Sequence, residues 1–388
     1  MFNLNIRPFD YSDPWQIPLT DRLHTLAKGK IRIAYFYEEP NNSTFRYRAY
    51  NMCQALNHGN DDSFSASYFF ISDLGMVNII AELADMLVVC RSRYCNNIGH
   101  LISIFHAKGK RVLFDIDDLI FDTEYTHLIL NSLDQNLALS QTWDHMFAYI
   151  ARMGETLKLC DGALTTNLYL ANKISEFSGL QAKVIPNFIN KEQLDISDAV
   201  YNRKVSSSFF SEGKITFGYF SGSPSHNLDY AMIVPAMEQI LSENPNTALL
   251  VVGYIDIGHT LSRFGDRVAR QPFHDYVNLQ QLIGSVEFNL MPLQNNVFTS
   301  CKSELKYFEA AIVGTLSIAS PSYTYSMAIQ DGENGYISKS HQWTNKIQTA
   351  INGIARYKEM AIRARDDAYN KYAWCNQKEN ILKALNLL

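Results

Sequence analysis

Short apolar runs rich in β-branched residues alternate with longer segments of helical periodicity along most of this sequence, beginning near residue 30. Such alternation is typical of parallel sheets in which a helix connects each strand to the next. The alternation is interrupted once, over residues 189–213, where no sustained apolar pattern is present and a linker is expected. The sequence therefore predicts an α/β protein with two Rossmann-like halves, each built on a doubly wound parallel sheet.

The length of the chain supports two domains, because a single hydrophobic core seldom grows beyond about 250–300 residues and this chain has 388. Parallel sheets bind ligands beyond the carboxyl ends of their strands, so two such domains facing each other would enclose a cleft. We therefore expect the chemistry in the loops that follow the apolar strands KIRIAYFY, RVLFDI and KITFGYF. The expected units are a domain over residues 1–188, the linker over 189–213, a domain over 214–372 and a final helical segment over 373–388.

Composition and charge argue against several classes of protein. The formal net charge of −5 disfavours a nucleic-acid-binding protein, since affinity for a phosphate backbone needs an excess of Lys and Arg. The six cysteines include no CxxC pair, so we expect reduced thiols and neither a zinc site nor a redox disulfide. No apolar run of about 18 residues is present and the start lacks the order of a signal peptide, so a cytoplasmic protein is expected.

Residues 301–336 contain the most informative motif, a helical Lys-x-x-Glu-Ala followed by Gly-Thr-x-x-Ile-Ala-Ser and a loop that ends in Asp-Gly-x-Asn-Gly. This stretch resembles the donor-binding signature of GT-B glycosyltransferases, especially those of glycosyltransferase family 4. The resemblance covers residues 210–340 well and the first half of the chain only in general plan. The matching residues are Lys306, Glu309, Ala310, the run 314–320, Asp331, Gly332, Asn334 and Gly335.

The resemblance implies a GT-B fold, in which two Rossmann-like domains face each other across a cleft and the second domain binds a nucleotide sugar. Glu309 would then accept hydrogen bonds from the two ribose hydroxyls of the donor, and Lys306 would lie close to its diphosphate. A final helix that crosses back to the first domain is also implied. The resemblance further implies that the substrate is a dTDP-, UDP- or GDP-linked donor and that the site requires neither cofactor nor metal.

Elementary chemistry agrees with the two residue roles. A carboxylate can bind both hydroxyls of a cis-diol, and an ammonium group offsets charge on a diphosphate and on the leaving group. Lys306 and Glu309 are three positions apart and so share one face of the predicted helix. The alternative is an ion pair on a solvated helix surface. Family 4 enzymes usually have a further glutamate where this sequence has Cys301. Glu304 lies too near Glu309 in sequence to replace that missing glutamate on the same helix face.

Two further segments are candidates for donor binding. The turn SGSPSH follows KITFGYF, and its Gly222 and Ser223 would let the backbone approach a diphosphate at a helix start, with His226 close by. Family 4 enzymes often have an Arg and a Lys in this turn, and this sequence has neither. An ordinary strand-to-helix turn with a Ser cap is the alternative. Phe273 follows the strand DRVAR, at the place where the GT-B resemblance puts the nucleobase.

The strand RVLFDI runs into three acidic residues, Asp115, Asp117 and Asp118, which imply a polar cleft at its carboxyl end. Glycosyltransferases of polysaccharide assembly, rhamnosyltransferase-like ones included, look similar here. Asp117 or Asp118 would orient an acceptor hydroxyl, or act as its general base if the enzyme inverts configuration. Two alternatives stay open: a divalent-metal site of a single-domain GT-A glycosyltransferase, and acidic residues that cap the next helix.

Arg46 and Arg48 follow the first strand, at the entrance of a helix that would face the cleft from the acceptor side. The two side chains point in different directions on a helix, so we expect only one of them to meet the donor phosphate or an anionic acceptor. Solvated arginines are the alternative.

Together these features predict a glycosyltransferase that moves a hexose, with rhamnose among the candidates, from a nucleotide diphosphate to a glycan or lipid-linked acceptor in cell-surface polysaccharide synthesis. Lys306, Asp117 and Asp118 are the expected catalytic residues. A lipid-linked acceptor would bring the protein transiently to the inner surface of the membrane. A non-catalytic subunit that binds sugar nucleotides and a GT-B nucleotide-sugar epimerase stay open as alternatives.

Overall fold

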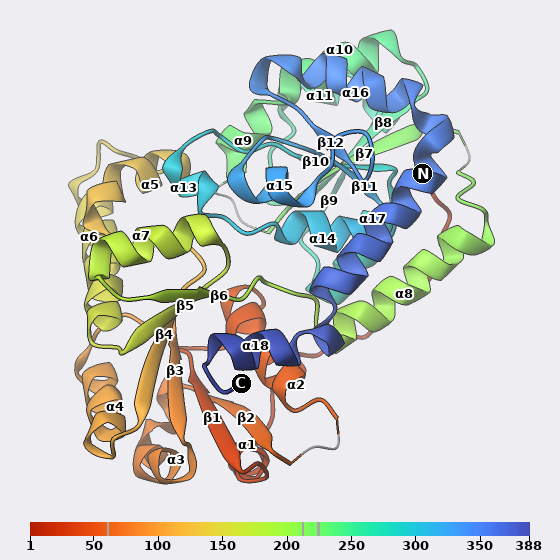
Figure 1. The fold of residues 1–388 in the computed structure, drawn as a ribbon. Helices are drawn as coiled ribbons and strands as arrows, with labels where there is room; N and C mark the ends of the chain where they lie inside the picture. Colours follow the sequence, from red (N-terminus) through yellow and green to blue (C-terminus); the bar gives the residue numbers. More distant parts are fainter. Residues whose placement is uncertain (60–61, 212, 223–225) are drawn as a thin grey trace.

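The computed structural model describes residues 1–59, 62–211, 213–222 and 226–388, and it contains two separate sheets (Figure 1). Both are six-stranded, and all their paired strands run parallel. The first sheet has the order β2-β1-β3-β4-β5-β6 and the second the order β12-β11-β10-β7-β8-β9. The first sheet comprises β1 Ile31–Phe36, β2 Phe64–Phe69, β3 Met86–Cys90, β4 Arg111–Asp115, β5 Gly162–Thr165 and β6 Ala182–Val184. The second comprises β7 Ile215–Ser221, β8 Thr247–Gly253, β9 Val268–Gln271, β10 Phe288–Met291, β11 Leu316–Ala319 and β12 Tyr336–Ile337.

The strand orders fix where a ligand can bind. In each sheet the chain moves outward from its first strand and then returns to that strand's other side, between β1 and β3 and between β7 and β10. A crevice forms at such a reversal, beyond the carboxyl ends of the strands. The predicted site segments with Arg46, Gly222 and Glu309 follow β1, β7 and β10, which border these two crevices, while Asp117 follows β4 and Phe273 follows β9 at the same carboxyl edges.

Helices cover both faces of each sheet. In the first domain they are α1 Leu19–Leu26, the π-helix η1 Arg46–Tyr50, α2 Asn51–Leu56, α3 Val77–Leu83, α4 Asn96–Ala107, α5 Thr126–Ser132, α6 Ser140–Lys158 and α7 Leu168–Ser178. In the second they are α9 Asn227–Ala231, α10 Val234–Glu243, α11 Gly258–Ser262, α12 Tyr276–Ser285, α13 Val297–Ser300, α14 Leu305–Ala311, α15 Tyr323–Ala328, α16 Trp343–Asn352 and α17 Tyr357–Tyr372. Local signals set their limits: Asn167 caps the start of α7 by accepting from Leu170 N, and Gly179 ends it with φ 74°.

The segment expected to be a linker, residues 189–213, contains the helix α8 Lys191–Ser206. Asn190 caps it, and Gln193, Ser197 and Lys204 are among its buried side chains, which explains why an apolar pattern was not visible. α8 packs closely on α12, where a Cβ at Gly284 would lie 2.2 Å from Cγ1 of Val200. The helical segment that follows β7 is divided, because α9 ends before α10 begins with a proline in its first turn.

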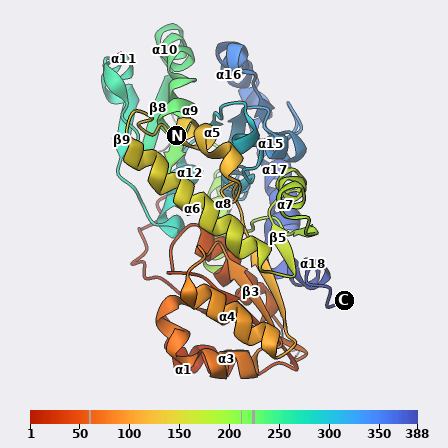
Figure 2. The same ribbon diagram turned by 90° about the vertical axis from the view of Figure 1, so that its left-hand side faces the viewer.

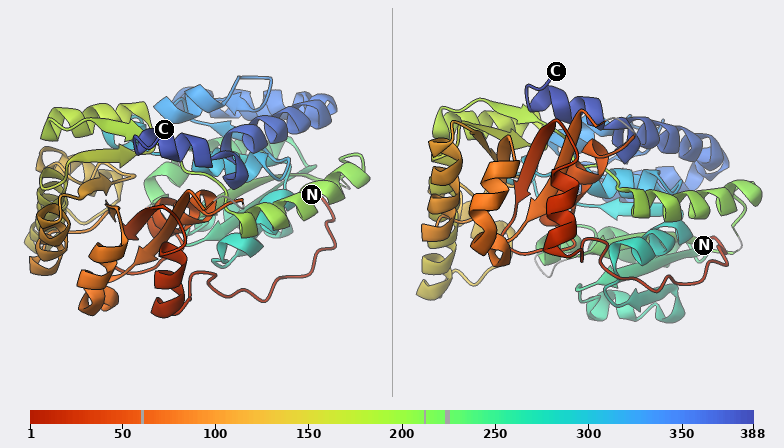
Figure 3. Two further views of the ribbon diagram at one scale, coloured as in Figure 1. Left: turned by 60° about the horizontal axis from the view of Figure 1, so that its bottom comes forward. Right: turned by 90° about the horizontal axis from the view of Figure 1, so that it is seen from below.

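Several segments join the two domains. Helix α18, Lys378–Ala384, follows α17 and lies against the first domain, where Arg111 donates to Leu385 O and Lys378 to His58 O (Figures 1 and 3). The N-terminal arm runs along the second domain and reaches the first at α1 (Figure 3). On another side of the molecule, α5 of the first domain lies against α13 of the second (Figure 1), and α6 runs alongside the first domain next to α5 (Figure 2).

Among the residues that the structure describes, no helix combines the length and the apolar character needed to cross a membrane.

Candidate active site

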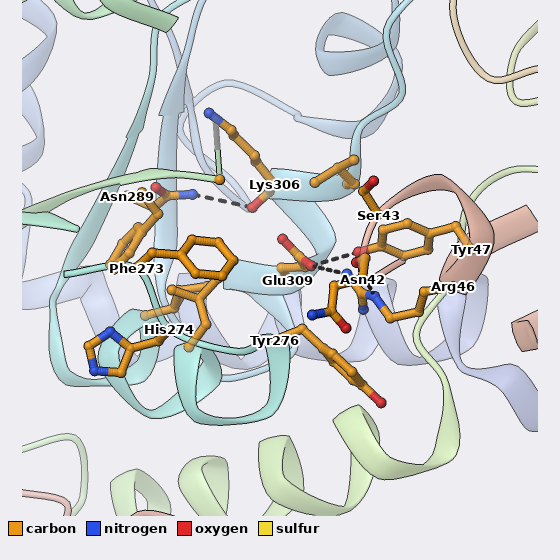
Figure 4. Close-up of a pocket in the computed structure, with 15 residues that line it drawn as sticks. Asn42, Ser43, Arg46, Tyr47, Phe273, His274, Tyr276, Asn289, Lys306 and Glu309 are labelled. Atoms are coloured by element: carbon orange, nitrogen blue, oxygen red, sulfur yellow. Dashed lines mark hydrogen bonds and ion pairs between the residues drawn. The ribbon is translucent and has the colours of Figure 1, made fainter. Parts of the chain in front are cut away.

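A pocket of about 310 Å³ lies between the two domains, beyond the carboxyl ends of β1 and β7 (Figure 4). We call it the Glu309 pocket. The first domain contributes Asn42, Ser43, Arg46 and Tyr47 to its lining. The second contributes Phe220, Gly222, Phe273, His274, Tyr276, Leu279, Ile283, Asn289, Leu305, Lys306 and Glu309. The pocket therefore contains the predicted donor-site residues Gly222, Phe273, Lys306 and Glu309.

Glu309 lies in helix α14, and its carboxylate accepts hydrogen bonds from side chains of η1 and α8. Its Oε1 accepts from Tyr47 OH at 2.6 Å and from Nε2 of Gln193 at 3.1 Å, and Nη2 of Arg46 lies 3.5 Å away. Figure 4 shows the other carboxylate oxygen turned away from these groups, toward the side of the pocket where Lys306 and Phe273 lie. The carboxylate is 7% exposed and faces the pocket, not bulk solvent.

Lys306 stands one turn before Glu309 on the same helix. Its Nζ lies 5.4 Å from the centre of the Tyr219 ring, and its backbone carbonyl accepts from Nδ2 of Asn289. Burial lowers the pKa of Lys306 to about 8, with Asp229 opposing that change and Lys302 adding to it. This ammonium group can lose its proton close to neutral pH.

A second pocket of about 500 Å³ adjoins the first, and the two share Ser43, Tyr47 and Leu305. We call it the Asp118 pocket. It is lined by Ser43, Thr44, Tyr47, Arg91, Asp117, Asp118, Ile120, Ile129, Leu133, His145, Met146, Tyr149, His226, Phe298, Lys302 and Leu305. Helices α5 and α6 supply one wall, and Asn296 of the second domain donates to Oγ of Ser132 in α5.

Both acidic residues of the second pocket face cations. Asp117 accepts from Nη1 of Arg91 at 3.1 Å and from Thr44 at 3.0 Å. Oδ1 of Asp118 lies 3.5 Å from Nζ of Lys302, which comes from the second domain, and no described residue donates a hydrogen bond to this oxygen. Oδ1 of Asp118 is thus a buried oxygen whose one ion-pair partner among the described residues is Lys302.

The turn after β7 is only partly described. Gly222 lines the Glu309 pocket, and Ser223 lies outside the described residues. His226 lines the Asp118 pocket and contacts Asp229 at 3.0 Å through Nδ1. Burial, together with Lys306, lowers the pKa of His226 to about 4, so the imidazole is neutral at physiological pH.

The expectation that Arg48 and Asp115 could serve the ligand is corrected by their contacts. Both are 0% exposed, and neither lines either pocket. Arg48 donates to both oxygens of Asp115, at 2.7 and 2.9 Å, and to the carbonyl of Ile185. Arg48 of η1 and Asp115 of β4 thus form a buried ion pair. Of the two arginines, Arg46 is the one that reaches the pocket, so one arginine faces the cleft.

Cys301 does not face the Glu309 pocket either. Its side chain is fully buried among first-domain residues, and its carbonyl accepts from Nδ2 of Asn167. The neighbouring Lys302 points into the Asp118 pocket instead. The sequence reasoning missed Lys302, Tyr47 and Gln193. Only Lys302 had a visible signal, since it precedes Lys306 by four residues in the donor motif.

No protein-family model matches the sequence, and no curated protein matches it either. Solved structures do match. HepE from Anabaena, in complex with UDP and glucose, has a TM-score of 0.61 at 13% identity, over 92% of this chain and 100% of that chain. A glycosyltransferase from Rickettsia africae has a TM-score of 0.58 at 12% identity, over 91% and 98% of the two chains. Sucrose-phosphate synthase from Thermosynechococcus elongatus has a TM-score of 0.55 at 14% identity, over 92% and 96%.

The chain has the GT-B fold. Two Rossmann-like domains with parallel sheets are present, and the two pockets lie between them. The alternative of a single-domain GT-A enzyme is therefore wrong. Asp115 and Asp117, the Asp-x-Asp that this alternative would use to hold a metal, pair with Arg48 and Arg91. Within the described part of the chain, no cluster of three His, Cys, Asp or Glu side chains has the arrangement of a metal site.

Proposed function

We propose that this protein is a glycosyltransferase that moves a sugar from a nucleotide diphosphate, bound in the Glu309 pocket, to a hydroxyl of an acceptor in the Asp118 pocket. The observation that carries the proposal is the position of Glu309 and Lys306, side by side in an interdomain pocket that adjoins an acidic one. The GT-B fold supports it. So do the structures with that fold, since HepE was crystallised with UDP-glucose and TarM of S. aureus with UDP and α-GlcNAc-glycerol.

The donor would bind with its nucleoside in the Glu309 pocket. Phe273 stacks on Tyr254 at a centroid distance of 5.5 Å, and its 44% exposed ring offers a flat apolar surface to a base. Glu309 offers a carboxylate to the ribose, and Lys306 offers an ammonium group to the diphosphate. The diphosphate would then lie where the two pockets meet, so that the sugar projects into the Asp118 pocket.

Transfer breaks the bond between the anomeric carbon and the diphosphate oxygen and forms one from that carbon to the acceptor oxygen. Lys306 and Lys302 would stabilise the negative charge that develops on the departing diphosphate, with Lys302 leaving Asp118 to do so. The acceptor proton passes to Asp117 or Asp118 if configuration inverts, and to the departing phosphate if it is retained. Holding the two substrates together in one cleft supplies a further large part of the rate.

The acceptor that we propose is a glycan or a lipid-linked sugar, and the sugar transferred is a hexose, with rhamnose among the candidates. This part rests on the motif resemblance to family 4 enzymes of cell-surface polysaccharide synthesis. The lining of the Asp118 pocket has polar and apolar parts, which supports such an acceptor. Its carboxylates and Arg91 suit sugar hydroxyls, and Ile120, Ile129 and Phe298 suit an apolar group. A lipid-linked acceptor implies transient contact with a membrane surface.

A second candidate is a non-catalytic subunit that binds nucleotide sugars. It is favoured by Cys301, which is buried away from the Glu309 pocket and supplies no carboxylate to the transferred sugar. Hydrolysis of the bound donor in the absence of acceptor would distinguish a transferase from such a subunit.

The proposal is tested by the melting temperature of the protein with a panel of nucleotide diphosphates and their sugars. A ligand that binds only the folded protein raises the melting temperature. We expect one dTDP-, UDP- or GDP-linked compound to stabilise the wild-type protein and Glu309→Ala to lose most of that effect. The control is Asp195→Ala, which removes an exposed carboxylate outside the pocket and should keep the full shift. Equal shifts for wild type and Glu309→Ala would contradict the assignment.

A further inference from the structure

Glu309 enters its pocket with one of its two carboxylate oxygens already occupied. Oε1 has Tyr47 OH, Nε2 of Gln193 and Nη2 of Arg46 around it, at 2.6, 3.1 and 3.5 Å. Within the part of the chain that the structure describes, no group donates to Oε2. The three groups come from η1 of the first domain and from α8, and so from other elements than α14, the helix that carries the carboxylate.

The groups around Oε1 are themselves fixed. Tyr47 is 3% exposed, and burial raises the pKa of its hydroxyl well above the usual range, so the hydroxyl keeps its proton and donates. Gln193 is fully buried, and its Oε1 accepts from Nη1 of Arg46 at 2.8 Å, which leaves its Nε2 to face Glu309. The Arg46 guanidinium lies between two rings, 4.1 Å from the centre of Tyr47 and 4.2 Å from that of Tyr276.

A cis-diol binds a carboxylate best when each hydroxyl donates to its own oxygen. Oε1 has no room for a further donor, because it already faces a hydroxyl, an amide and a guanidinium. A nucleotide sugar ring is therefore left with Oε2, so its 2′- and 3′-hydroxyls cannot each donate to a carboxylate oxygen of their own. The 3′-hydroxyl is present in both ribose and 2′-deoxyribose and is sufficient for one such bond.

Building on the proposed function, we infer that Glu309 binds a single hydroxyl of the nucleotide and that the site accepts 2′-deoxyribonucleoside diphosphates as well as ribonucleoside diphosphates. Tyr47 is the positioning residue responsible, because its hydroxyl occupies Oε1 from the opposite domain. The donors of this protein then include deoxythymidine-type as well as uridine-type or guanosine-type compounds.

The two modes of binding differ in a measurable way. A hydroxyl that donates to a carboxylate changes affinity by roughly tenfold or more when it is removed. Two-oxygen binding of the diol thus predicts a clear preference for UDP over 2′-deoxy-UDP. One-oxygen binding predicts dissociation constants that agree within about threefold, which is less than 1 kcal/mol.

The test is calorimetric titration of the full chain with two matched pairs, UDP with 2′-deoxy-UDP and GDP with 2′-deoxy-GDP, so that base and sugar preferences are separated. In the wild-type protein we expect the two members of the tighter-binding pair to agree within about threefold. Tyr47→Phe frees acceptor capacity on Oε1 and should raise the preference for the ribonucleotide to roughly fivefold or more. The matched control is Tyr50→Phe on the same π-helix, which loses a hydrogen bond to Glu192 and should keep the wild-type ratio.

Three results would overturn the inference. A wild-type preference for the ribonucleotide of roughly tenfold or more would show that both hydroxyls contribute. A ratio in Tyr47→Phe equal to that of the wild-type protein would remove Tyr47 as the cause. If no diphosphate of either pair binds the wild-type protein, and none in the wider thermal panel does, the proposed function fails together with the inference. The first two outcomes leave nucleotide binding intact, so the two failures are distinguishable.

Discussion

Lys306 links the proposed chemistry to pH at the scale of one residue. Burial lowers its pKa to about 8, and Asp229, Glu309 and Lys302 are the charged groups that act on it. Only the protonated form attracts a diphosphate, so the dissociation constant of the best-binding sugar nucleotide should rise as pH increases from about 7 to 9. The rise should approach roughly tenfold per pH unit above the pKa. Titration calorimetry at several pH values measures it.

The matched variant for this prediction is Lys306→Met, which keeps the length of the side chain and removes its charge. It should bind the nucleotide weakly and with no change over the same pH interval. His226 stays neutral throughout, since its pKa of about 4 lies far below this interval. A wild-type affinity that is constant between pH 7 and 9 would show that Lys306 does not face the diphosphate.

The positions of individual site residues were predictable where a motif fixed them on one helix. Lys306 and Glu309 share a helix face through their spacing alone, and both line the pocket. The partners of Glu309 could not be found in this way, because Tyr47 and Gln193 come from segments more than a hundred residues away. Arg46 and Arg48 look equivalent in the sequence, and only the direction of η1 decides that one faces the cleft and the other the core.

At the scale of elements, the end of β4 is held by a buried ion pair rather than by a ligand. Burial raises the pKa of Asp115 while the Arg48 guanidinium opposes that rise. Asp115→Asn would leave the charge of Arg48 without its partner, so we expect the free energy of unfolding to fall by about 3–5 kcal/mol. Nucleotide affinity, measured well below the new unfolding midpoint, should stay within about twofold of wild type. Denaturant unfolding and calorimetry provide the two measurements.

Asp117→Asn is the control for this prediction, because Asp117 is two residues further on and its ion pair with Arg91 is partly exposed. Its loss should change stability by only about 1 kcal/mol or less. If Asp115→Asn instead preserved stability and weakened ligand binding, Asp115 would have a direct role that its burial does not suggest.

The strands were more predictable than the connections between them. Buried parallel strands appear as continuous apolar runs, as β3 (MLVVC) and β8 (TALLVVG) do, whereas the edge strands β6 (AKV) and β9 (VARQ) are partly or largely exposed and carry a weaker signal. Helix α8 gave no such signal, since much of its buried face is polar: Gln193 binds Glu309 and Ser197 accepts from Gln280. Because these polar side chains alternate with the buried Leu194, Ile196 and Val200, α8 has no continuous apolar stripe to reveal it.

For the whole molecule, the sequence predicted two Rossmann-like halves but not how they are held together. The N-terminal arm does part of this. Trp15 packs edge-on against Phe45 and Tyr50 of the first domain and lies parallel to Tyr276 of the second, at a centroid distance of 6.2 Å. Nothing in the opening residues suggests this role, because a single tryptophan in an irregular segment has no periodicity.

Trp15 therefore ties the proposed donor site to the stability of the domain arrangement. Trp15→Ala should lower the free energy of unfolding by about 3–5 kcal/mol, since the side chain is 2% exposed. It should also weaken nucleotide binding, because Tyr276 lines the Glu309 pocket and would lose a ring that supports it. Phe9→Ala removes an aromatic ring from the same arm that is 53% exposed, and should change stability by only about 0.5 kcal/mol or less. If Trp15→Ala were as stable as Phe9→Ala, the arm would not hold the two domains together, and closure of the cleft would depend on the other interdomain contacts, among them those of Glu309, α8, α18 and α5.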